Sequence, residues 1–414
     1  MSREPAGDTT EILNLTEWEL ANLHLPPVTT VTLYEGSAPV EFLRSRIACL
    51  LEKNPWLTSR IVKKSTVNGV VALAYTKGLD AESVVGEHLS VYEPGEVELS
   101  LDKPYEELVR CLLPLQRSMT LPGFALVVSM NHTLGDGHTY YRLYSMLGID
   151  TQPEELDPVR VPGFEEAKTE IIGSKETAMF SSAGLSFGIL GTYLCAKFGR
   201  RPPQNVCVNE VDAAWVDKEK ARVAQEAQVP FVSSNDVLTS WFFREMKSDL
   251  HIMVANFRSR RPSVLNLTDA HVGNYEANLP YFPGDVETPE VIRQSIRGAD
   301  GAFRAKRAGS PATELPSFSK LLRNRTSIVT NWASFYCDVK LQNDVQDTGE
   351  DKLEPKLHFP IMESDGIITS VWNNAIIFRP RAGELGVLLI TRRFDNDMLA
   401  RGQQQDGPVG KRIL

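Results

Sequence analysis

Residues 124–137 read FALVVSMNHTLGDG, and this stretch decides the expected fold. Its first seven residues are almost all apolar, which is typical of a short buried β-strand. After Gly137, aromatic and apolar side chains recur at helical spacing, so a helix is expected to begin there. His132 and Asp136 would therefore lie on a tight loop between a buried strand and a helix. Loops held by such a scaffold are where functional side chains tend to lie.

The same alternation of strands and helices continues on both sides of this unit. Strand patterns occupy 28–34, 61–62, 70–75, 252–256, 375–379 and 385–391, and helical patterns occupy 40–53, 217–227 and the segment after the N-cap candidates at 233–236. The chain has 414 residues, more than a single core normally contains. We therefore expect an α/β protein with an N-terminal domain at 1–172, a crossover linker at 173–205 and a C-terminal domain at 206–414.

The composition narrows the functional classes. The formal net charge is −9 with no basic stripe, which argues against a nucleic-acid partner. The five cysteines are widely spaced and form no CxxC pair, so neither a metal site nor a disulfide framework is expected. The polar N-terminal residues 1–11 resemble neither a signal nor a transit peptide. A cytoplasmic protein is the resulting expectation.

The pattern HxxxDG at 132–137 suits acyl transfer from a thioester. A hydroxyl or amine that attacks a thioester must lose a proton, and an imidazole accepts protons near neutral pH. His132 is therefore the candidate general base, and Asp136 and Gly137 complete the candidate catalytic motif. Asp136 is expected to fix the loop by pairing with an arginine, while Gly135 and Gly137 let the backbone turn sharply near substrate. Alternatively, His132 is a hydrogen-bonded histidine at a strand end, Asp136 is a helix N-cap and the glycines are plain turn residues. His138 is assigned no role.

This segment resembles the active-site motif of the HxxxDG acyltransferases. They include the plant-type BAHD acyltransferases, trichothecene acetyltransferases, wax ester synthases and peptide-synthetase condensation domains. Further segments agree with the family in order and spacing: NPWL at 54–57 with Arg60, SNDVLTSW at 234–241, NFRSR at 256–260, GN at 273–274 and TNW at 330–332. The resemblance spans nearly the whole chain and indicates an outlying BAHD-like member.

The resemblance implies two chloramphenicol-acetyltransferase-like domains of mixed sheets, with an active-site tunnel between them. It implies acyl-CoA as co-substrate, a small-molecule acceptor, no cofactor, no metal and a monomeric chain. His132 would abstract the acceptor proton. Thr330 and Trp332 match tunnel residues that can donate to the oxyanion, and Arg258 matches the arginine that pairs with Asp136. Two alternatives without a functional role stay open: Arg258 belongs to a solvated basic turn, and Trp332 is an aromatic side chain of the core.

Two departures from the family pattern bear on this resemblance. Where BAHD members usually carry DFGWG, the chain reads FYCDVK at 335–340 and then an acidic insertion, so only Asp338 corresponds. The resemblance therefore does not predict the structure of the hinge or of the CoA side of the tunnel. Asn131 stands where condensation domains and wax ester synthases usually have a first histidine, which favours the BAHD-like interpretation.

Residues 177–196 form an uncharged stretch of nearly bilayer-spanning length. Lys197, Arg200 and Arg201 follow it and could meet anionic headgroups. Three interpretations stay open: an inter-domain helix packed on the protein, peripheral membrane contact, and a membrane span. Membrane contact would suit a hydrophobic acceptor.

These observations favour an acyl-CoA-dependent acyltransferase that moves an acyl group to a hydroxyl or amine in secondary or lipid metabolism. One alternative is a free-standing condensation domain that takes its acyl group from a carrier protein. Another is a catalytically silent homologue that acts as a binding subunit. Neither the acceptor nor the acyl chain length follows from any motif.

Overall fold

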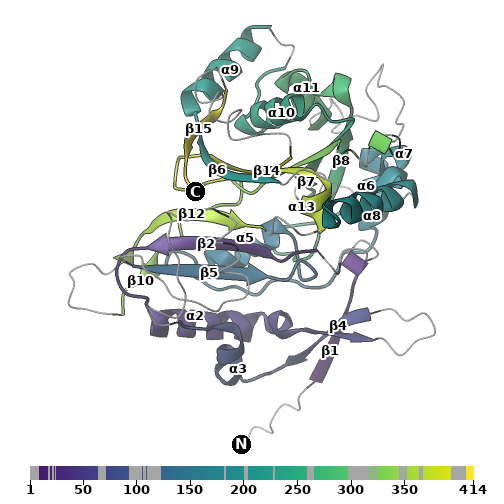
Figure 1. Cartoon of the computed structure of the whole chain (residues 1–414). Helices are drawn as coiled ribbons and strands as arrows, with labels where there is room; N and C mark the ends of the chain where they lie inside the picture. The colour runs from purple at the N-terminus through teal and green to yellow at the C-terminus, as the bar shows by residue number, and fades with distance from the viewer. Residues whose placement is uncertain are drawn as a thin grey trace, which may run out of the picture.

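The structure is a computed structural model that describes most of the chain. The described residues are 9–16, 19–20, 23, 25–63, 71–92, 105, 109, 123–180, 183–199, 204–226, 229–258, 265–296, 317, 319–320, 323, 325–344, 352–362, 367–392 and 407–414. Figure 1 shows the first half of the chain below and most of the second half above, so that two α/β parts lie against each other.

The first half contains two small antiparallel sheets. One has the strand order β12-β2-β5, with β12 at Pro355–Ile361, β2 at Val28–Tyr34 and β5 at Phe124–Met130. The other has the order β1-β4-β3, and the helices of this half are α2, α3 and α5. Their bounds are Thr9–Asn14 (β1), Arg60–Lys63 (β3), Val71–Lys77 (β4), Val40–Lys53 (α2), Ala81–His88 (α3) and Gly137–Ser145 (α5), with a 3₁₀ turn at Pro55–Thr58. The predicted strands at 28–34 and 124–130 and the helix at 40–53 are confirmed.

Strand β12, Pro355–Ile361, comes from the second half of the sequence but pairs with β2 (Figure 1). Its buried His358 fixes it there, because Nδ1 lies 2.8 Å from Oγ1 of Thr32 and Nε2 lies 2.9 Å from the hydroxyl of Tyr141. Burial lowers the pKa of His358 to about 3, so the ring is neutral at physiological pH. The sequence-based division places residues 206–414 in the C-terminal domain. Strand β12 lies beyond that boundary but completes a sheet of the first half.

The second half is built on a seven-stranded mixed sheet with the order β15-β6-β14-β13-β9-β7-β8. The neighbours β13, β9 and β7 are parallel, and the remaining pairs are antiparallel. The strands are Asn205–Val211 (β6), Leu250–Asn256 (β7), Glu276–Tyr281 (β8), Thr326–Asn331 (β9), Asn373–Phe378 (β13), Gly386–Thr391 (β14) and Val409–Arg412 (β15). Helices α9, Ala213–Glu226, α10, Ser234–Met246, and α11, Pro289–Ile296, lie above this sheet in Figure 1.

The connection between the halves consists of helices α6, Phe164–Ile172, α7, Ser174–Phe180, and α8, Ala183–Lys197. The expected uncharged stretch 177–196 is thus divided between α7 and α8, and residues 181–182 lie outside the described ones. Within the described chain, none of the helices combines the length and the apolar character needed to cross a bilayer. Shorter elements are β10, Leu341–Gln342, β11, Lys352–Leu353, α13, Ile367–Val371, and a 3₁₀ turn at Pro283–Asp285.

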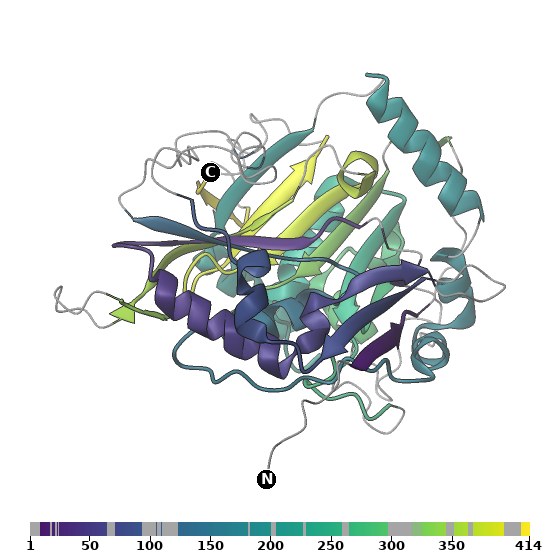
Figure 2. The same ribbon diagram turned by 90° about the horizontal axis from the view of Figure 1, so that it is seen from below.

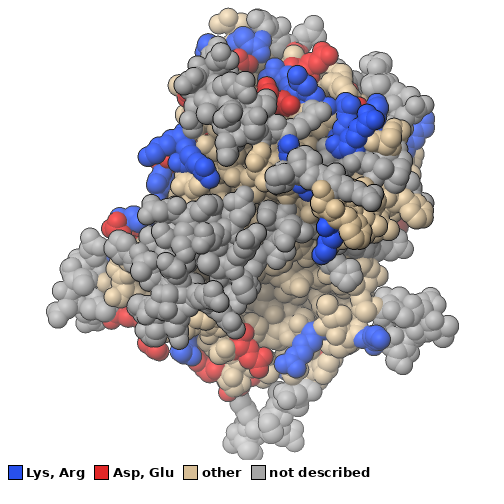
Figure 3. Space-filling model, viewed as in Figure 1, with Lys and Arg blue, Asp and Glu red and all other residues tan. Residues whose placement is uncertain are grey.

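Helix α8 runs along the outer edge of the molecule in Figure 2. The side of α8 that faces the rest of the molecule packs against α13. Four large apolar side chains at helical spacing are 42% to 73% exposed: Phe187, Leu190 and Leu194 of α8, and Phe198 directly after it. In the space-filling view, the Lys and Arg side chains of the described residues form separate groups rather than one stripe (Figure 3). The described outer side of α8 is therefore apolar.

Candidate active site

The loop that carries His132 is a tight turn at the end of β5. The backbone N–H of Leu134 donates to the carbonyl of Asn131 at 2.9 Å. The side-chain oxygen of Asn131 accepts a second hydrogen bond within the turn, from the N–H of Thr133 at 2.9 Å. The Asn131 side chain thus stabilises the loop.

Asp136 holds the end of this loop through three hydrogen bonds. Its Oδ1 accepts from the N–H of Thr139, which makes Asp136 the N-cap of α5. Its Oδ2 accepts from Nη1 of Arg258 at 2.7 Å and from the N–H of Tyr275 at 3.0 Å. Asp136 is 1% exposed and Arg258 is 3% exposed. Burial alone would raise the pKa of Asp136, but the Arg258 guanidinium holds that pKa below its usual range. One carboxylate therefore serves both as N-cap and as ion-pair partner.

Arg258 is saturated by partners from several segments. Its Nε donates to the carbonyl of His271 at 3.0 Å, and its Nη2 donates to the carbonyl of Gly273 at 3.0 Å. The guanidinium lies 4.9 Å from the ring centre of Tyr275. Arg258 is therefore a buried structural cation, whereas residues 259–261 of the same basic segment lie outside the described residues.

A second buried ion pair supports the His132 loop. Oε1 of Glu19 lies 2.8 Å from Nε of Arg160. Nη2 of Arg160 donates to the carbonyls of the two residues that follow His132, both at 3.3 Å. Nδ2 of Asn274 donates to the His132 carbonyl at 2.9 Å and to Glu19 at 3.2 Å. Sequence reasoning missed Glu19 and Arg160, because these partners lie far apart in the chain and form no motif.

Of the two glycines of the motif, Gly135 is the one that close packing requires. Neither Gly135 nor Gly137 has a positive φ. The sharp turn expected from the sequence therefore does not explain why glycine stands at these positions. An ideal Cβ on Gly135 would lie 2.6 Å from the Thr139 side chain, closer than real Cβ contacts. A Cβ on Gly137 would lie 3.5 Å from the indole nitrogen of Trp332. The start of α5 therefore lies directly beside the Trp332 N–H.

His132 opens into a cavity of about 420 Å³, called here the His132 cavity. Both halves of the chain line it, through Leu25, Pro26, Pro27, Val28, His132, Gly137, Ile189, Val254, Glu276, Asn278, Ile328, Thr330, Trp332, Met362, Val371, Trp372, Asn374, Ala375 and Ile376. No described residue makes a hydrogen bond with the His132 ring or with the indole N–H of Trp332. Within the described chain, these groups stay available to a molecule in the cavity.

Two hollows adjoin the parallel strands of the seven-stranded sheet. Thr330 and Ile376 lie side by side on neighbouring strands, and both line the His132 cavity, whereas Val254 lines both hollows. Successive side chains of a strand point to opposite faces, so Asn331 and Ile377 face the other way. These two residues line a second pocket of about 490 Å³, called here the α10 pocket.

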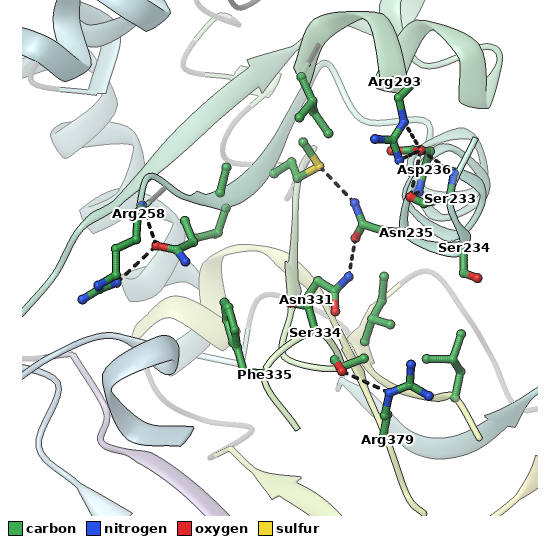
Figure 4. A pocket seen from close by; sticks show the side chains of 18 residues that line it. Ser233, Ser234, Asn235, Asp236, Arg258, Arg293, Asn331, Ser334, Phe335 and Arg379 are labelled. Atoms are coloured by element: carbon green, nitrogen blue, oxygen red, sulfur yellow. Dashed lines mark hydrogen bonds and ion pairs between the residues drawn. The ribbon is translucent and has the colours of Figure 1, made fainter. Parts of the chain in front are cut away.

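The α10 pocket is polar and lies at the start of α10 (Figure 4). Ser233 caps that helix, and Asn235 accepts a hydrogen bond from Asn331 at 2.9 Å. Arg293 forms a buried ion pair with Asp236 in the same pocket. Arg379 donates to the carbonyl of Ala333, but no carboxylate of the described residues lies within ion-pair distance of it. Arg379 is therefore the cation of this pocket that an anionic ligand could meet.

The predicted site residues thus fall into two groups. His132, Gly137, Thr330 and Trp332 line one cavity, and Asp136 with Arg258 lies behind the loop. Asp338 lies elsewhere and accepts a hydrogen bond from Tyr336 at 2.7 Å. His138 is nearly buried beside Asp269, and burial lowers its pKa to about 4. Sequence reasoning missed Glu276 and Asn278, which line the cavity from the edge strand β8.

Comparisons with known proteins show what the chain resembles. No protein-family model matches it, and no curated protein matches it either. Among solved structures, F. graminearum TRI101 complexed with coenzyme A and deoxynivalenol is 12% identical, with a TM-score of 0.58 over 98% of this chain and 100% of that one. F. sporotrichioides TRI101 complexed with coenzyme A and T-2 is also 12% identical, with a TM-score of 0.54 over the same shares.

A condensation domain shows the same likeness. The first condensation domain of the calcium-dependent antibiotic synthetase is 15% identical, with a TM-score of 0.53 over 96% of this chain and 94% of that one. At these identities the likeness is one of fold. The chain has the α/β fold of two chloramphenicol-acetyltransferase-like domains that these proteins share, as the sequence predicts.

Proposed function

We propose that the protein transfers an acyl group from acyl-CoA to a hydroxyl or amine of a small acceptor, with His132 as general base. The observation that carries this proposal is that one cavity holds both an imidazole without a described hydrogen-bond partner and the Trp332 indole. A base and an oxyanion donor in one enclosed site are what acyl transfer requires. The solved neighbours, two of them named with coenzyme A, support the donor class.

The chemistry follows from these positions. The acceptor gives its proton to His132 as its oxygen or nitrogen adds to the thioester carbonyl. The resulting oxyanion accepts hydrogen bonds from the indole N–H of Trp332 and the hydroxyl of Thr330. When the tetrahedral intermediate collapses, the carbon–sulfur bond breaks, and the leaving thiolate takes the proton from His132. The products are the acylated acceptor and free CoA.

The donor would enter from the α10 pocket. Thr330 lines the His132 cavity and the next residue, Asn331, lines the α10 pocket, so the ends of the parallel strands adjoin both hollows. We infer that the acyl group passes the ends of these strands to reach the base, while the phosphates stay near Arg379. Arg379→Gln should raise KM for acetyl-CoA several-fold with little change in kcat. Arg381→Gln is the matched control, since Arg381 pairs with Glu384 on the surface.

Thiol release from acetyl-CoA or a long-chain acyl-CoA, with a panel of alcohols and amines, tests the proposal. His132→Ala should reduce the rate on the order of 10²–10⁴-fold, as removal of a general base does. His88→Ala is the control, because His88 is an exposed histidine at the end of α3. If purified His132→Ala keeps more than a tenth of the wild-type rate, His132 is not the base.

The two alternatives differ from the proposal in the acyl donor or in the absence of transfer. Transfer only from an acyl group on a carrier protein would identify a condensation activity, for which the condensation-domain likeness gives a structural precedent. Acetyl-CoA binding without release from any donor would identify a binding subunit.

A further inference from the structure

A carboxyl group lines the His132 cavity together with the base. Glu276 is the first residue of β8, the edge strand of the seven-stranded sheet, and it lines the cavity together with His132. Its side chain is accessible only in part, and it meets the cavity. An acidic group in a largely apolar cavity needs a partner, since an unpaired buried charge is costly.

None of the described residues supplies that partner. No described donor lies within hydrogen-bond or ion-pair distance of the Glu276 carboxyl. The charged groups that influence it are His132, Arg258, Lys168 and the like-charged Asp136. Arg258 is bound to Asp136, and Lys168 is bound to Glu165, so both cations are already engaged. Burial accordingly raises the pKa of Glu276 to about 7.

A second polar side chain extends the same surface. Asn278 lies two residues further along β8, so its side chain points to the same face as that of Glu276. It also lines the cavity and makes no side-chain hydrogen bond with a described residue. Apolar side chains form much of the rest of the lining, among them Val28, Ile189, Ile328, Met362 and Val371. Glu276 and Asn278 therefore form a polar strip along β8 within a cavity whose lining is largely apolar.

This arrangement excludes two roles for Glu276 among the described residues. It is not half of an internal ion pair, because no described cation contacts it. It is not in hydrogen-bonding contact with His132, so it does not orient that ring directly. A donor group on a molecule in the cavity is the partner that would satisfy it. Among such groups, a protonated amine offers both charge and hydrogen bonds.

We propose that Glu276 binds a protonated amine on the acceptor, so that the acceptor is an apolar amino alcohol whose hydroxyl reacts at His132. This inference rests on the proposed function. The ammonium group donates hydrogen bonds to the Glu276 carboxylate, and the apolar part lies against the apolar side chains of the lining. An amine held in its protonated form has no lone pair with which to attack the thioester. The hydroxyl is therefore acylated, and the product is an ester that keeps its amine.

Equilibrium binding tests this inference without any catalytic step. Trp332 and Trp372 both line the cavity, so their fluorescence reports occupancy. The probes are 2-amino-1-octanol and 1,2-octanediol, which match in size and differ in the charged group. At pH 8 the wild type should bind the amino alcohol at least tenfold more tightly than the diol.

Three variants make the test specific. Glu276→Gln should reduce this preference to less than twofold, whereas Glu276→Asp, which keeps the charge, should retain most of it. Glu245→Gln removes the same charge from an exposed position on α10 and should keep the full preference. Circular dichroism of each variant establishes that it is folded.

The inference is overturned if the wild type does not prefer the amino alcohol, or if folded Glu276→Gln keeps the preference. Neither result depends on turnover. Failure of the proposed function would instead appear as an absence of thiol release from acyl-CoA in the wild type, whatever the binding preference.

Discussion

Replacing Asp136 by Asn should destabilise the protein strongly. The wild-type carboxylate accepts three hydrogen bonds, from Thr139, Tyr275 and Arg258, and it is almost completely buried. An asparagine offers one acceptor oxygen and turns an N–H group toward a donor. It also leaves the Arg258 cation unpaired in the interior. Removing one partner of a buried ion pair costs on the order of 3–5 kcal/mol.

Urea unfolding followed by tryptophan fluorescence measures this loss, through the midpoint and the slope. Asp212→Asn is the matched control, because Asp212 caps α9 at an exposed position and accepts from the N–H of Trp215 at 3.1 Å. Asn and Asp are similar N-caps, so this control should change the free energy of unfolding little. Any large loss at Asp136 then reports the ion pair and its hydrogen bonds.

A double-mutant cycle with Arg258→Met completes the test. Once the cation is absent, Asp136→Asn should cost less, with a coupling of about 2–3 kcal/mol between the two sites. The reasoning is refuted if Asp136→Asn unfolds within about 1 kcal/mol of the wild type, or if the two changes are additive. Loss of activity at unchanged stability would point to a chemical role for Asp136.

Four further outcomes are expected. Gly135→Ala should lower the free energy of unfolding by about 1–3 kcal/mol, since its Cβ would lie 2.6 Å from the Thr139 side chain. Gly86→Ala, in helix α3 with no atom within 4 Å of its Cβ, should raise it by up to about 1 kcal/mol, and equal effects would contradict the steric argument. His358 is neutral in the fold and takes up a proton on unfolding, so stability should fall by about 1.4 kcal/mol per pH unit below pH 6.5 on its account; an unchanged slope in His358→Gln would argue against this. The raised pKa of Glu276 means that the folded chain loses stability as pH rises from 4.5 to 7, so Glu276→Gln should be more stable than the wild type at pH 8, by up to about 3 kcal/mol in urea unfolding. If the outer side of α8 docks on a bilayer, wild-type protein should float with anionic vesicles, and a triple serine variant should not; failure of the wild type to float removes the idea. The three exposed positions to change are Phe187, Leu190 and Leu194.

Local patterns in the sequence were sufficient for the elements and for the main motif. The apolar run at 124–130 and the helical spacing after Gly137 predicted β5 and α5, with His132 on the loop between them. Such features depend on neighbours within a few residues, where side-chain period and capping act directly. The family resemblance added Thr330, Trp332 and Arg258, which the fold brings to the same region.

The contacts that support the His132 loop, and the position of Glu276 in the cavity, follow only from the tertiary structure. Glu19 and Arg160 hold the His132 loop from segments 141 residues apart, and β12 joins a sheet whose other strands lie more than 200 residues earlier. Glu276 looks in sequence like any surface glutamate that begins a strand. It becomes a candidate binding group only because folding encloses it beside His132 without a described partner. Burial and the distances between remote charges set the cost of ionisation, and neither can be read from the order of residues along the chain.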